Sequence, residues 1–411
     1  MESKSNANRL FYGSCFALIT TAFSFAIAAG ILDQLKTELG LTAGEAGLIT
    51  SMWFLGFPIS MVIGGLIYHK VGGKVIMQFA FFAHVIGILL LIFSGSFTGL
   101  LVANLLIGLG NGCTEAACNP MIADAYEGNK MSTMLNRFHM WFPGGIALGS
   151  LLSGFMTKMG IMGVNQIWLL LVPAFIYGYL FLGQTWPKAK VQEASTLGGN
   201  IKAMFTPLFL FIAVCMSLTA ISEFGPNQWV SLILSKSGAE PMIILALTAG
   251  LMAVARYFGG NMVAKFDQTG VLLGSAILAT IGVYLFSTQT GAMAYVAAII
   301  FALGIAYFWP NMIGLVATKV PKSGALGMSF VGGVGMFANT IFQPIIGGWI
   351  DSDRAAASAA GLTGDELELV AGQETMLTMT IFPGILIVLF TLLYFWLKNK
   401  KDDDVVPVAA H

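Results

Sequence analysis

The chain has 411 residues, of which 10% are charged and 57% hydrophobic, with a mean hydropathy of +0.82. A soluble domain carries about 25% charged residues, so most of this chain is expected to lie in lipid. Basic and acidic residues number 20 each, which excludes a strongly basic nucleic-acid binder. The four cysteines lie in apolar stretches without paired spacing, so neither a disulfide framework nor a metal site nor any cofactor is predicted.

Twelve apolar stretches are long enough to cross a bilayer, which takes about 20 residues in a helix. The first follows a short polar N-terminus without a small-residue cleavage site, so we expect an uncleaved span rather than a signal peptide. The sequence therefore predicts an all-α membrane protein with twelve transmembrane helices. Their expected ranges are 11–33, 46–68, 75–94, 100–124, 132–157, 166–183, 207–233, 242–264, 270–288, 292–316, 325–350 and 376–397.

The distribution of basic residues predicts the orientation. An even number of spans puts both termini on one side, and with that side cytoplasmic, fourteen Lys and Arg residues lie inside against four outside. Cytoplasmic loops carry an excess of Lys and Arg, so we expect a multi-pass protein of the cell (inner) membrane with both termini in the cytoplasm. The acidic loop 351–375 is then external, and we interpret it as a solvated helical cap.

A polar segment in the middle of the chain divides the spans into six plus six. We predict an N-terminal six-helix bundle at 1–183, a cytoplasmic linker at 184–206, a C-terminal bundle at 207–397 and a disordered tail at 398–411. A weak internal repeat with an offset of 194 residues supports pseudo-symmetric halves. Two such halves are typical of secondary transporters that bind a solute between them near the midplane. We expect the protein to be monomeric.

The loop after the second span reads GGLIYHKVGGKV at 64–75. It resembles the cytoplasmic loop motif of the major facilitator superfamily, although His69 stands where that family usually has an acid. A degraded copy with the same glycine-to-lysine spacing follows the eighth span. The resemblance implies the major facilitator fold. His69, Lys70 and Lys74 are candidate gating residues, or alternatively ordinary residues of the positive inner side.

Ionisable groups within the spans are functional candidates, because each costs at least about 2.5–3.5 kcal/mol on insertion scales. Asn111, Glu115 and Asn119 recur at intervals of four and share one helix face. We predict Glu115 as a proton carrier, with His139 as a second proton-coupling group at similar depth on the next helix. The alternative is that Glu115 neutralises Arg137, a candidate gating residue, in a static pair.

The seventh span contains SEFGPNQW at 222–229, where Pro226 removes a backbone donor and is expected to break the helix beside a cavity. Carboxylate and amide groups beside an aromatic face suit a sugar, which is polar at its edge and apolar on its C–H faces. A kink with an interfacial tryptophan is the alternative. We predict Glu223 as a further proton-coupling group and Arg256 as a gating residue or the partner of an acid.

The predicted substrate-binding residues are amides and tryptophans of several spans. They are Asn111, Asn119, Asn136, Asn227, Gln228, Trp229, Trp309, Asn311, Asn339 and Gln343, and Trp53 and Tyr307 are expected to line the same cavity.

A narrower resemblance rests on CTEAACNP at 113–120 and on LNRFHMWFPGG, which begins at residue 135. These stretches resemble the fucose, galactose and glucose proton-symporter family, as do FWPN at 308–311 and GGVGMFANTIFQP in the eleventh span. The resemblance implies that Glu115 is the protonatable acid and that Asn119, Asn136 and His139 belong to or border a sugar site. The first span lacks the acid that such symporters often carry there.

These observations together predict a secondary transporter that moves a neutral sugar-like solute by alternating access and proton symport. A multidrug antiporter would need a mostly apolar pocket, and an organic-anion transporter would need a buried base, which Arg137 or Arg256 could supply. A membrane-embedded enzyme is disfavoured because no catalytic motif is present, and a channel because no filter-like loop is evident.

Overall fold

The computed structural model describes residues 2–125, 134, 137–187 and 197–399, and every regular element in this part of the chain is a helix. The first half contains α1 (Glu2–Leu39), α2 (Ala43–Phe93), α3 (Phe97–Ala125), α5 (Trp141–Lys158), η1 (Gly163–Leu170) and α6 (Leu171–Phe181). The second half contains α7 (Leu197–Met204), α8 (Pro207–Gln228), α9 (Val230–Ile233), α10 (Pro241–Tyr257), α11 (Gly259–Thr288), α12 (Ala292–Ile305), α13 (Phe308–Lys319), η2 (Pro321–Ser323), α14 (Gly324–Ala359), α15 (Gly364–Met379) and α16 (Ile381–Asn399).

The described residues form ten helical segments that are long and apolar enough to cross a membrane. Helix α2 supplies two of them, Ala43–Tyr68 and Lys70–Phe93. Two further helices, α5 and the shorter apolar α10, pack against each other. Together with the ten segments they give the twelve spans that the sequence predicts. Large apolar side chains such as Phe79, Phe82 and Phe155 are exposed on the outside. This pattern suits a hydrocarbon solvent and confirms the all-α membrane prediction.

Two long helices contain a break at a predicted loop. In α2, Gly72 has φ +78°, a left-handed conformation that glycine adopts at little cost, so the chain turns between two spans. In α11, Asp267 has φ +54°. Its carboxylate accepts hydrogen bonds from the Thr269 hydroxyl at 2.6 Å and the Gly270 amide at 2.8 Å, which offset the strain there. The breaks lie 195 residues apart, close to the offset of the sequence repeat.

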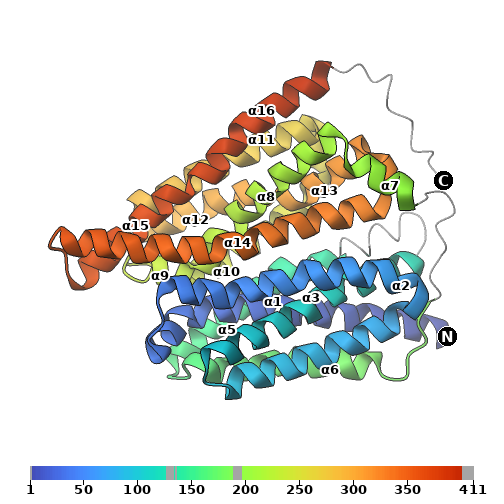
Figure 1. Ribbon diagram of the computed structural model, residues 1–411, viewed down its shortest axis with the longest axis horizontal. Helices are drawn as coiled ribbons and strands as arrows, with labels where there is room; N and C mark the ends of the chain where they lie inside the picture. The colour runs from blue at the N-terminus through green and yellow to red at the C-terminus, as the bar shows by residue number, and fades with distance from the viewer. Residues whose placement is uncertain (1, 126–133, 135–136, 188–196, 400–411) are drawn as a thin grey trace.

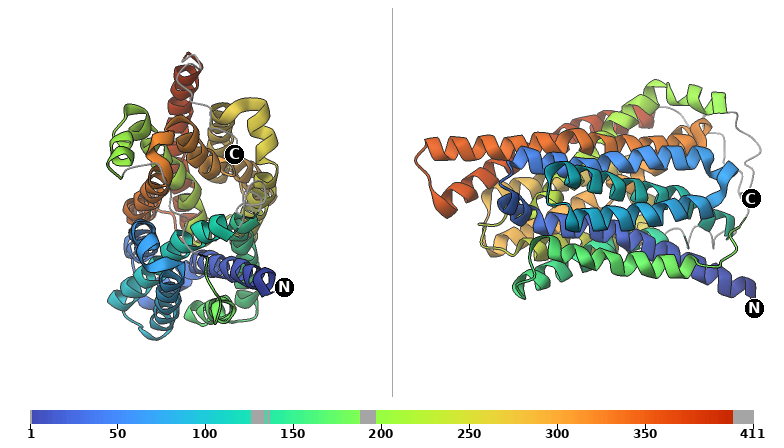
Figure 2. Two further views of the ribbon diagram at one scale, coloured as in Figure 1. Left: turned by 90° about the vertical axis from the view of Figure 1, so that its right-hand side faces the viewer. Right: turned by 60° about the horizontal axis from the view of Figure 1, so that its bottom comes forward.

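The helices form two groups that lie side by side (Figure 1). Helices α1 to α6 form the first bundle and α8 to α16 the second, and the start of α1 and the end of α16 lie toward the same end (Figure 1). We call this end the terminal end and the opposite one the distal end. Figure 2 shows the two bundles along and across their long axis. Residues 188–196 of the expected linker and 400–411 of the expected tail lie outside the described residues, and the domain boundaries drawn from the sequence stay a prediction.

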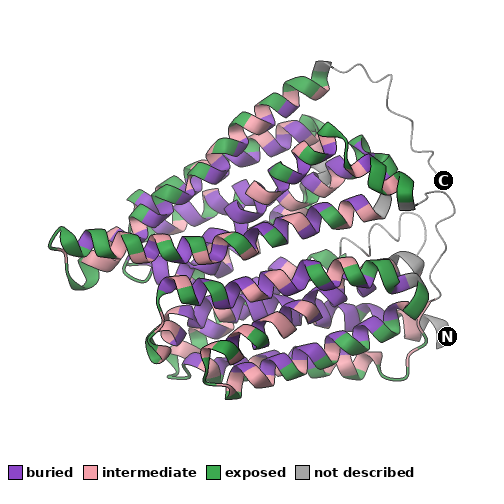
Figure 3. Cartoon of the chain, in the orientation of Figure 1, coloured by how far each residue is buried: buried purple, intermediate pink, exposed green. Residues whose placement is uncertain are grey.

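Helices α2 and α14 run along each other between the bundles and approach most closely at the distal end. A Cβ atom on Gly47 would lie 2.5 Å from the carbonyl oxygen of Gln343 and 2.7 Å from Pro344 Cα. Toward the terminal end, at Gly333, a Cβ would lie 3.5 Å from Pro58 Cβ, an ordinary contact. The absence of side chains at glycines therefore sets how tightly the two bundles close at the distal end. Figure 3 shows mostly buried residues where the bundles meet.

Candidate functional site

A small cavity lies between the two bundles, at residues that four different helices contribute. Its volume is about 10 Å³, about the space that one water molecule needs. Among the described residues, its lining consists of hydroxyl, amide, aromatic and small apolar groups and carries no charge. The lining residues are Ser24, Phe25 and Ala28 of α1, Thr50 and Trp53 of α2, Asn104 of α3 and Gln228 of α8. Such a lining can donate and accept hydrogen bonds and also cover an apolar face.

An aromatic cluster adjoins this cavity and crosses from one bundle to the other. The ring of Phe224 on α8 lies edge-to-face with Phe25 and with Phe54, both at 5.5 Å between centroids. Trp53 packs against Phe54 at 4.8 Å, and its indole nitrogen donates to the Ser24 hydroxyl at 2.8 Å. Because an edge-to-face pair with Phe54 and a hydrogen bond both fix its ring, Trp53 forms a well-defined wall of the cavity.

The second bundle places several buried amide groups near the interface without complete hydrogen bonding. The indole nitrogen of Trp229 donates to Gln343 Oε1 at 2.8 Å. Among the described residues, the amide nitrogens of Gln343 and Gln228 and the amide oxygen of Asn339 have no hydrogen-bond partner. A buried polar group in that state costs about 1–3 kcal/mol, so a solute with hydroxyl groups that reached Gln228 would recover part of that cost.

Glu223 and Arg256 form a buried ion pair within the second bundle. The carboxylate oxygen lies 3.5 Å from the Arg256 guanidinium, and the two side chains are 5% and 20% exposed. Arg256 also donates from Nε to the carbonyl oxygen of Ala306 at 2.9 Å, and the Tyr307 hydroxyl donates to the carbonyl of Ala255 at 3.0 Å. Arg256 therefore partners an acid, one of the two roles that the sequence predicted for it.

Glu115 is half-buried on α3, and its carboxylate accepts a hydrogen bond from the Asn119 amide at 2.6 Å. The Asn119 amide oxygen is buried and has no hydrogen-bond partner in the described part of the chain. Arg137 and His139 are exposed, and among the described residues no ion pair joins Glu115 to Arg137. The alternative of a static Glu115–Arg137 pair is therefore not what the structure contains, while the role of Glu115 as proton carrier stays a prediction.

The structure disperses the other predicted substrate-binding residues. Asn111 is fully buried and bonds His84 and Ser24 rather than lining the cavity. The Asn227 amide donates to the backbone oxygen of Glu223 at 2.8 Å. Trp309 on α13 lies against Gly332 of α14, and Asn311 is buried on α13. Of the predicted substrate-binding set, the cavity lining contains Gln228, and Trp53 joins it as expected.

Four predicted residues fall outside what the structure describes or away from the cavity. Asn136 and the side chain of His69 lie outside the described residues. Lys70 and Lys74 flank the turn at Gly72 and are exposed at the terminal end. Their gating role is therefore still a prediction.

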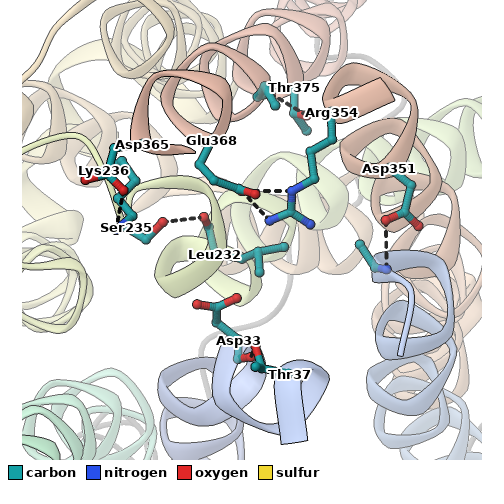
Figure 4. A network of polar contacts seen from close by, with 12 residues as sticks. Asp33, Thr37, Leu232, Ser235, Lys236, Asp351, Arg354, Asp365, Glu368 and Thr375 are labelled. Carbon is teal, nitrogen blue, oxygen red and sulfur yellow. Dashed lines mark hydrogen bonds and ion pairs between the residues drawn. The ribbon is translucent and has the colours of Figure 1, made fainter. Parts of the chain in front are cut away.

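The distal end carries a polar network that the sequence analysis treated as a solvated cap (Figure 4). Arg354 of α14 donates to the Glu368 carboxylate of α15 at 2.8 Å and 2.6 Å, with only 17% of the arginine side chain exposed. Asp33 of α1 faces the same region from the first bundle (Figure 4). Lys236 pairs with Asp365 at 2.8 Å, and this bond raises the pKa of the lysine. Part of the acidic loop is thus internally paired rather than simply solvated.

Sequence reasoning missed Ser24, Thr50, Asn104 and Phe25 among the lining residues. Hydroxyls and phenylalanines are common in membrane helices, so only Asn104 gave a usable signal. It lies seven residues before Asn111 and therefore on nearly the same face of α3.

A second, larger cavity of about 280 Å³ lies away from the bundle interface. It is lined between α8 and α14 by Val214, Ser217, Leu218, Ile221, Val334, Phe337, Ala338, Ile341 and Phe342. These residues belong to one bundle, and several are exposed on its outside. The groove is an apolar surface within the second bundle and not a space between the two.

Two bundles of membrane-spanning helices that enclose a polar cavity define a solute transporter. Residues 14–342 match the Major Facilitator Superfamily. The chain belongs to this superfamily, which consists of transporters and not of enzymes, and the major facilitator fold expected from the sequence is confirmed.

Several characterised proteins are similar to the chain over long stretches. The hexuronate transporter of Bacillus subtilis (strain 168) is 24% identical over 82% of this chain and 86% of its own length. A facilitated glucose transporter, solute carrier family 2 member 10 of Xenopus tropicalis, is 27% identical over 64% of this chain and 48% of its own length. The chain thus spans most of the first relative and about half of the second.

Solved structures show the same fold at low identity. A nucleoside transporter, NupG, superposes with a TM-score of 0.73 at 13% identity, covering 96% of this chain and all of its own. A bacterial homologue of the human lysosomal transporter Spinster, in an inward-facing and unoccupied conformation, gives 0.76 at 15% identity, over 98% of this chain and 99% of its own. At these identities the likeness concerns the fold alone.

Proposed function

We propose that this transporter carries a neutral, hydroxyl-rich solute of the sugar or polyol class by proton symport. The observation that carries the proposal is the uncharged cavity between the bundles, where Ser24, Thr50, Asn104 and Gln228 offer hydrogen bonds beside the ring of Trp53. A sugar ring requires both kinds of contact, because its edge is polar and its C–H faces are apolar. Glucose and myo-inositol transporters are among the similar proteins.

The proposal includes a change of conformation, because a cavity of about 10 Å³ is too small for a sugar. The bundles are held together at the distal end by the close approach of α2 and α14. We infer that separation at either end enlarges the cavity and admits the solute, as alternating access requires. With the termini in the cytoplasm, as the basic residues predict, the structure corresponds to a state closed on the outside.

Proton coupling is assigned to two carboxylates in different bundles. Glu223 faces Arg256, so a proton on Glu223 would dissolve the ion pair and release both side chains. Glu115 is bonded to Asn119, whose free amide oxygen leaves room for a change of partner when the acid is protonated. Each acid thus has a protonation-dependent partner, which a coupling residue needs. His139 is exposed in this conformation.

A sugar acid is the second candidate solute, and Arg256 favours it. Its guanidinium is a largely buried cation of the second bundle, and a proton on Glu223 would free it to bind a solute carboxylate. The similar proteins include a hexuronate and a sialic acid transporter. The neutral solute is preferred because the cavity lining carries no charge and Arg256 already has a carboxylate partner.

The proposal agrees with the resemblance of residues 113–120 to the fucose, galactose and glucose proton-symporter family. The similar proteins come from several transporter groups, so membership of that narrower family is part of the proposal. A multidrug function is disfavoured, because the apolar groove of α8 and α14 lies outside the bundle interface.

Uptake into proteoliposomes tests the function. The purified chain would be given radiolabelled D-glucose, myo-inositol or D-glucuronate, with and without a pH gradient that is acidic outside. We expect accumulation of a neutral solute that depends on the gradient and does not occur in protein-free liposomes. Accumulation of D-glucuronate alone would replace the neutral solute by a sugar acid, and uptake unaffected by the gradient would remove the proton coupling.

The cavity itself is tested by Gln228→Ala, which removes the unpartnered amide from its lining. We expect KM for the transported solute to rise about tenfold, because one hydrogen bond to a hydroxyl is worth about 1 kcal/mol and the neighbouring groups lose their geometry. Gln184→Ala is the matched control, because this half-buried amide lies outside the cavity lining and, among the described residues, donates to the nearby Leu182 carbonyl. An unchanged KM for Gln228→Ala would show that the solute binds elsewhere.

A further inference from the structure

A buried histidine on the span Lys70–Phe93, which contributes no residue to the cavity lining, begins a chain of hydrogen bonds in the first bundle. His84 lies on the second part of α2 and is completely buried. Its Nδ1 lies 2.8 Å from the Tyr177 hydroxyl of α6, and its Nε2 lies 2.9 Å from Asn111 Oδ1 of α3. The imidazole therefore links three helices, α2, α3 and α6, at one point.

The donors and acceptors of this group fit one protonation state. Asn111 Oδ1 can only accept, so Nε2 of His84 carries the proton and donates. Nδ1 is then an acceptor, and the Tyr177 hydroxyl donates to it. A neutral imidazole satisfies both bonds, which a buried polar group in a membrane span requires.

The chain continues from Asn111 to the cavity. The Asn111 amide nitrogen donates to the Ser24 hydroxyl at 3.5 Å, and the Trp53 indole nitrogen donates to the same hydroxyl at 2.8 Å. Ser24 in turn donates to the carbonyl oxygen of Thr21 at 2.7 Å. Ser24 and Trp53 both line the cavity. The hydrogen bonds of His84 thus end on two groups that a bound solute would touch.

Space for the imidazole exists because of a glycine on the facing helix. A Cβ on Gly110 would lie 2.6 Å from His84 Nε2 and 2.9 Å from Cγ. On α6, Gly178 leaves room for the ring of Phe81, and that ring packs edge-to-face on Tyr177 at 5.8 Å between centroids. The packing around His84 and Tyr177 therefore fixes both rings and leaves them little freedom to turn.

We propose that His84 and Tyr177 are positioning residues for the solute cavity. They hold the Asn111 amide in one orientation, and through Asn111 and Ser24 they fix the indole of Trp53. The inference rests on the proposed function only in taking the cavity as the solute site. Directional bonds in a buried network specify an orientation, whereas an apolar side chain of similar volume would fill the space without doing so.

The first arm of the test needs no solute. Amide and indole ¹⁵N labelling with NMR would follow the Trp53 indole N–H signal, assigned by its loss in Trp53→Phe. We expect His84→Leu to shift this signal while the signals of Trp349 and Trp396 stay in place. His84→Gln, whose amide nitrogen takes the position of Nε2, restores a donor to Asn111 and is expected to return the signal toward its wild-type position.

The second arm measures uptake of whichever solute among D-glucose, myo-inositol and D-glucuronate the wild-type chain accumulates. His84→Leu is expected to raise KM about tenfold with the maximal rate changed less than twofold, and His84→Gln to recover most of that KM. Ser150→Ala is the matched control, because within the described residues this buried hydroxyl donates to Ile146 of its own helix and to no other helix. This variant is expected to leave both KM and the Trp53 signal unchanged.

The outcomes separate this inference from the proposed function. If His84→Leu does not fold, Tyr177→Phe removes a single hydroxyl and is expected to shift the Trp53 signal and raise KM in the same direction by a smaller factor. An unmoved Trp53 signal in both variants, or a fall in maximal rate with KM unchanged, overturns the positioning role. If the wild-type chain accumulates none of the three solutes, the proposed function fails and the NMR arm alone decides the inference.

Discussion

The carboxylate of Asp351 on α14 accepts a hydrogen bond of 2.9 Å from the backbone amide of Ala43, and so caps the first turn of α2 from the opposite bundle. Its second oxygen accepts from the Gly44 amide, also at 2.9 Å. The capping box of α2 occupies the Glu45 amide and leaves those two donors unpaired within the helix. An anion at a helix N-terminus is favoured, so Asp351 helps to hold the bundles together at the distal end.

Replacement of Asp351 should open that end. Asp351→Ala removes two charge-assisted hydrogen bonds, worth about 1.5 kcal/mol together with the helix dipole, so we expect about tenfold more of the state that is open at the distal end. The measurement is alkylation of Ala28→Cys, a cavity residue, by an impermeant maleimide. The four native cysteines are buried and give little background.

The matched control for this experiment is Glu374→Gln, which removes an exposed acid from the neighbouring α15. It should leave the rate of alkylation at the wild-type value. Equal rates in Asp351→Ala and in the wild-type background would mean that the cap on α2 does not contribute to closure.

Closure at the distal end also depends on Gly47 of α2, which faces the backbone of α14. In Gly47→Ala, the new methyl group would lie 2.5 Å from the Gln343 carbonyl oxygen. We expect the closed state to lose about 1–3 kcal/mol and the alkylation of Ala28→Cys to rise by at least fivefold. In Gly348→Ala the added methyl meets nothing within 4 Å, so this variant should behave as wild type. The prediction is wrong if both alanine variants label at the same rate.

The Glu223–Arg256 pair should show strong coupling in stability. Arg256→Gln leaves a buried carboxylate without its cation, and we expect a loss of about 3 kcal/mol in the free energy of unfolding. Because both members are then neutral, Glu223→Gln combined with Arg256→Gln should regain most of this loss. The check is the thermal unfolding midpoint in detergent for the two single variants and the double variant. Additive effects of the single changes would show that the two side chains do not depend on each other.

Proton coupling through Glu115 gives a transport prediction. In Glu115→Gln the amide cannot release a proton at neutral pH, so the pH gradient should no longer drive accumulation. The solute concentration inside should then rise only to the concentration outside. Exchange of labelled for unlabelled solute across the membrane should continue, because no net proton movement is needed for it. Asn119→Ala serves as a comparison for gradient-driven accumulation, because it removes the hydrogen-bond partner of the acid and leaves the carboxyl group in place. Gradient-driven accumulation that survives in Glu115→Gln would exclude the acid as the carrier.

The sequence by itself determined the lipid environment, the all-helical fold with about twelve spans and the superfamily. Apolar stretches of about 20 residues can only satisfy their backbone in lipid as helices, and the turn predicted after the second span appears at Gly72. The sequence also marked Glu223 and Arg256, because a charge in a span is costly enough to be conspicuous. In each case the signal is local, so composition and spacing were sufficient.

Only the tertiary structure decided which side chains meet. Asn111, Glu115 and Asn119 share a face of α3, yet Asn111 turns to His84 while Glu115 and Asn119 bond each other. Ser24 and Gln228 lie more than 200 residues apart and become neighbours at one cavity only because two bundles pack together. Packing between helices depends on where glycines let backbones approach and on which partner a buried donor reaches, and neither is written in the spacing along one helix.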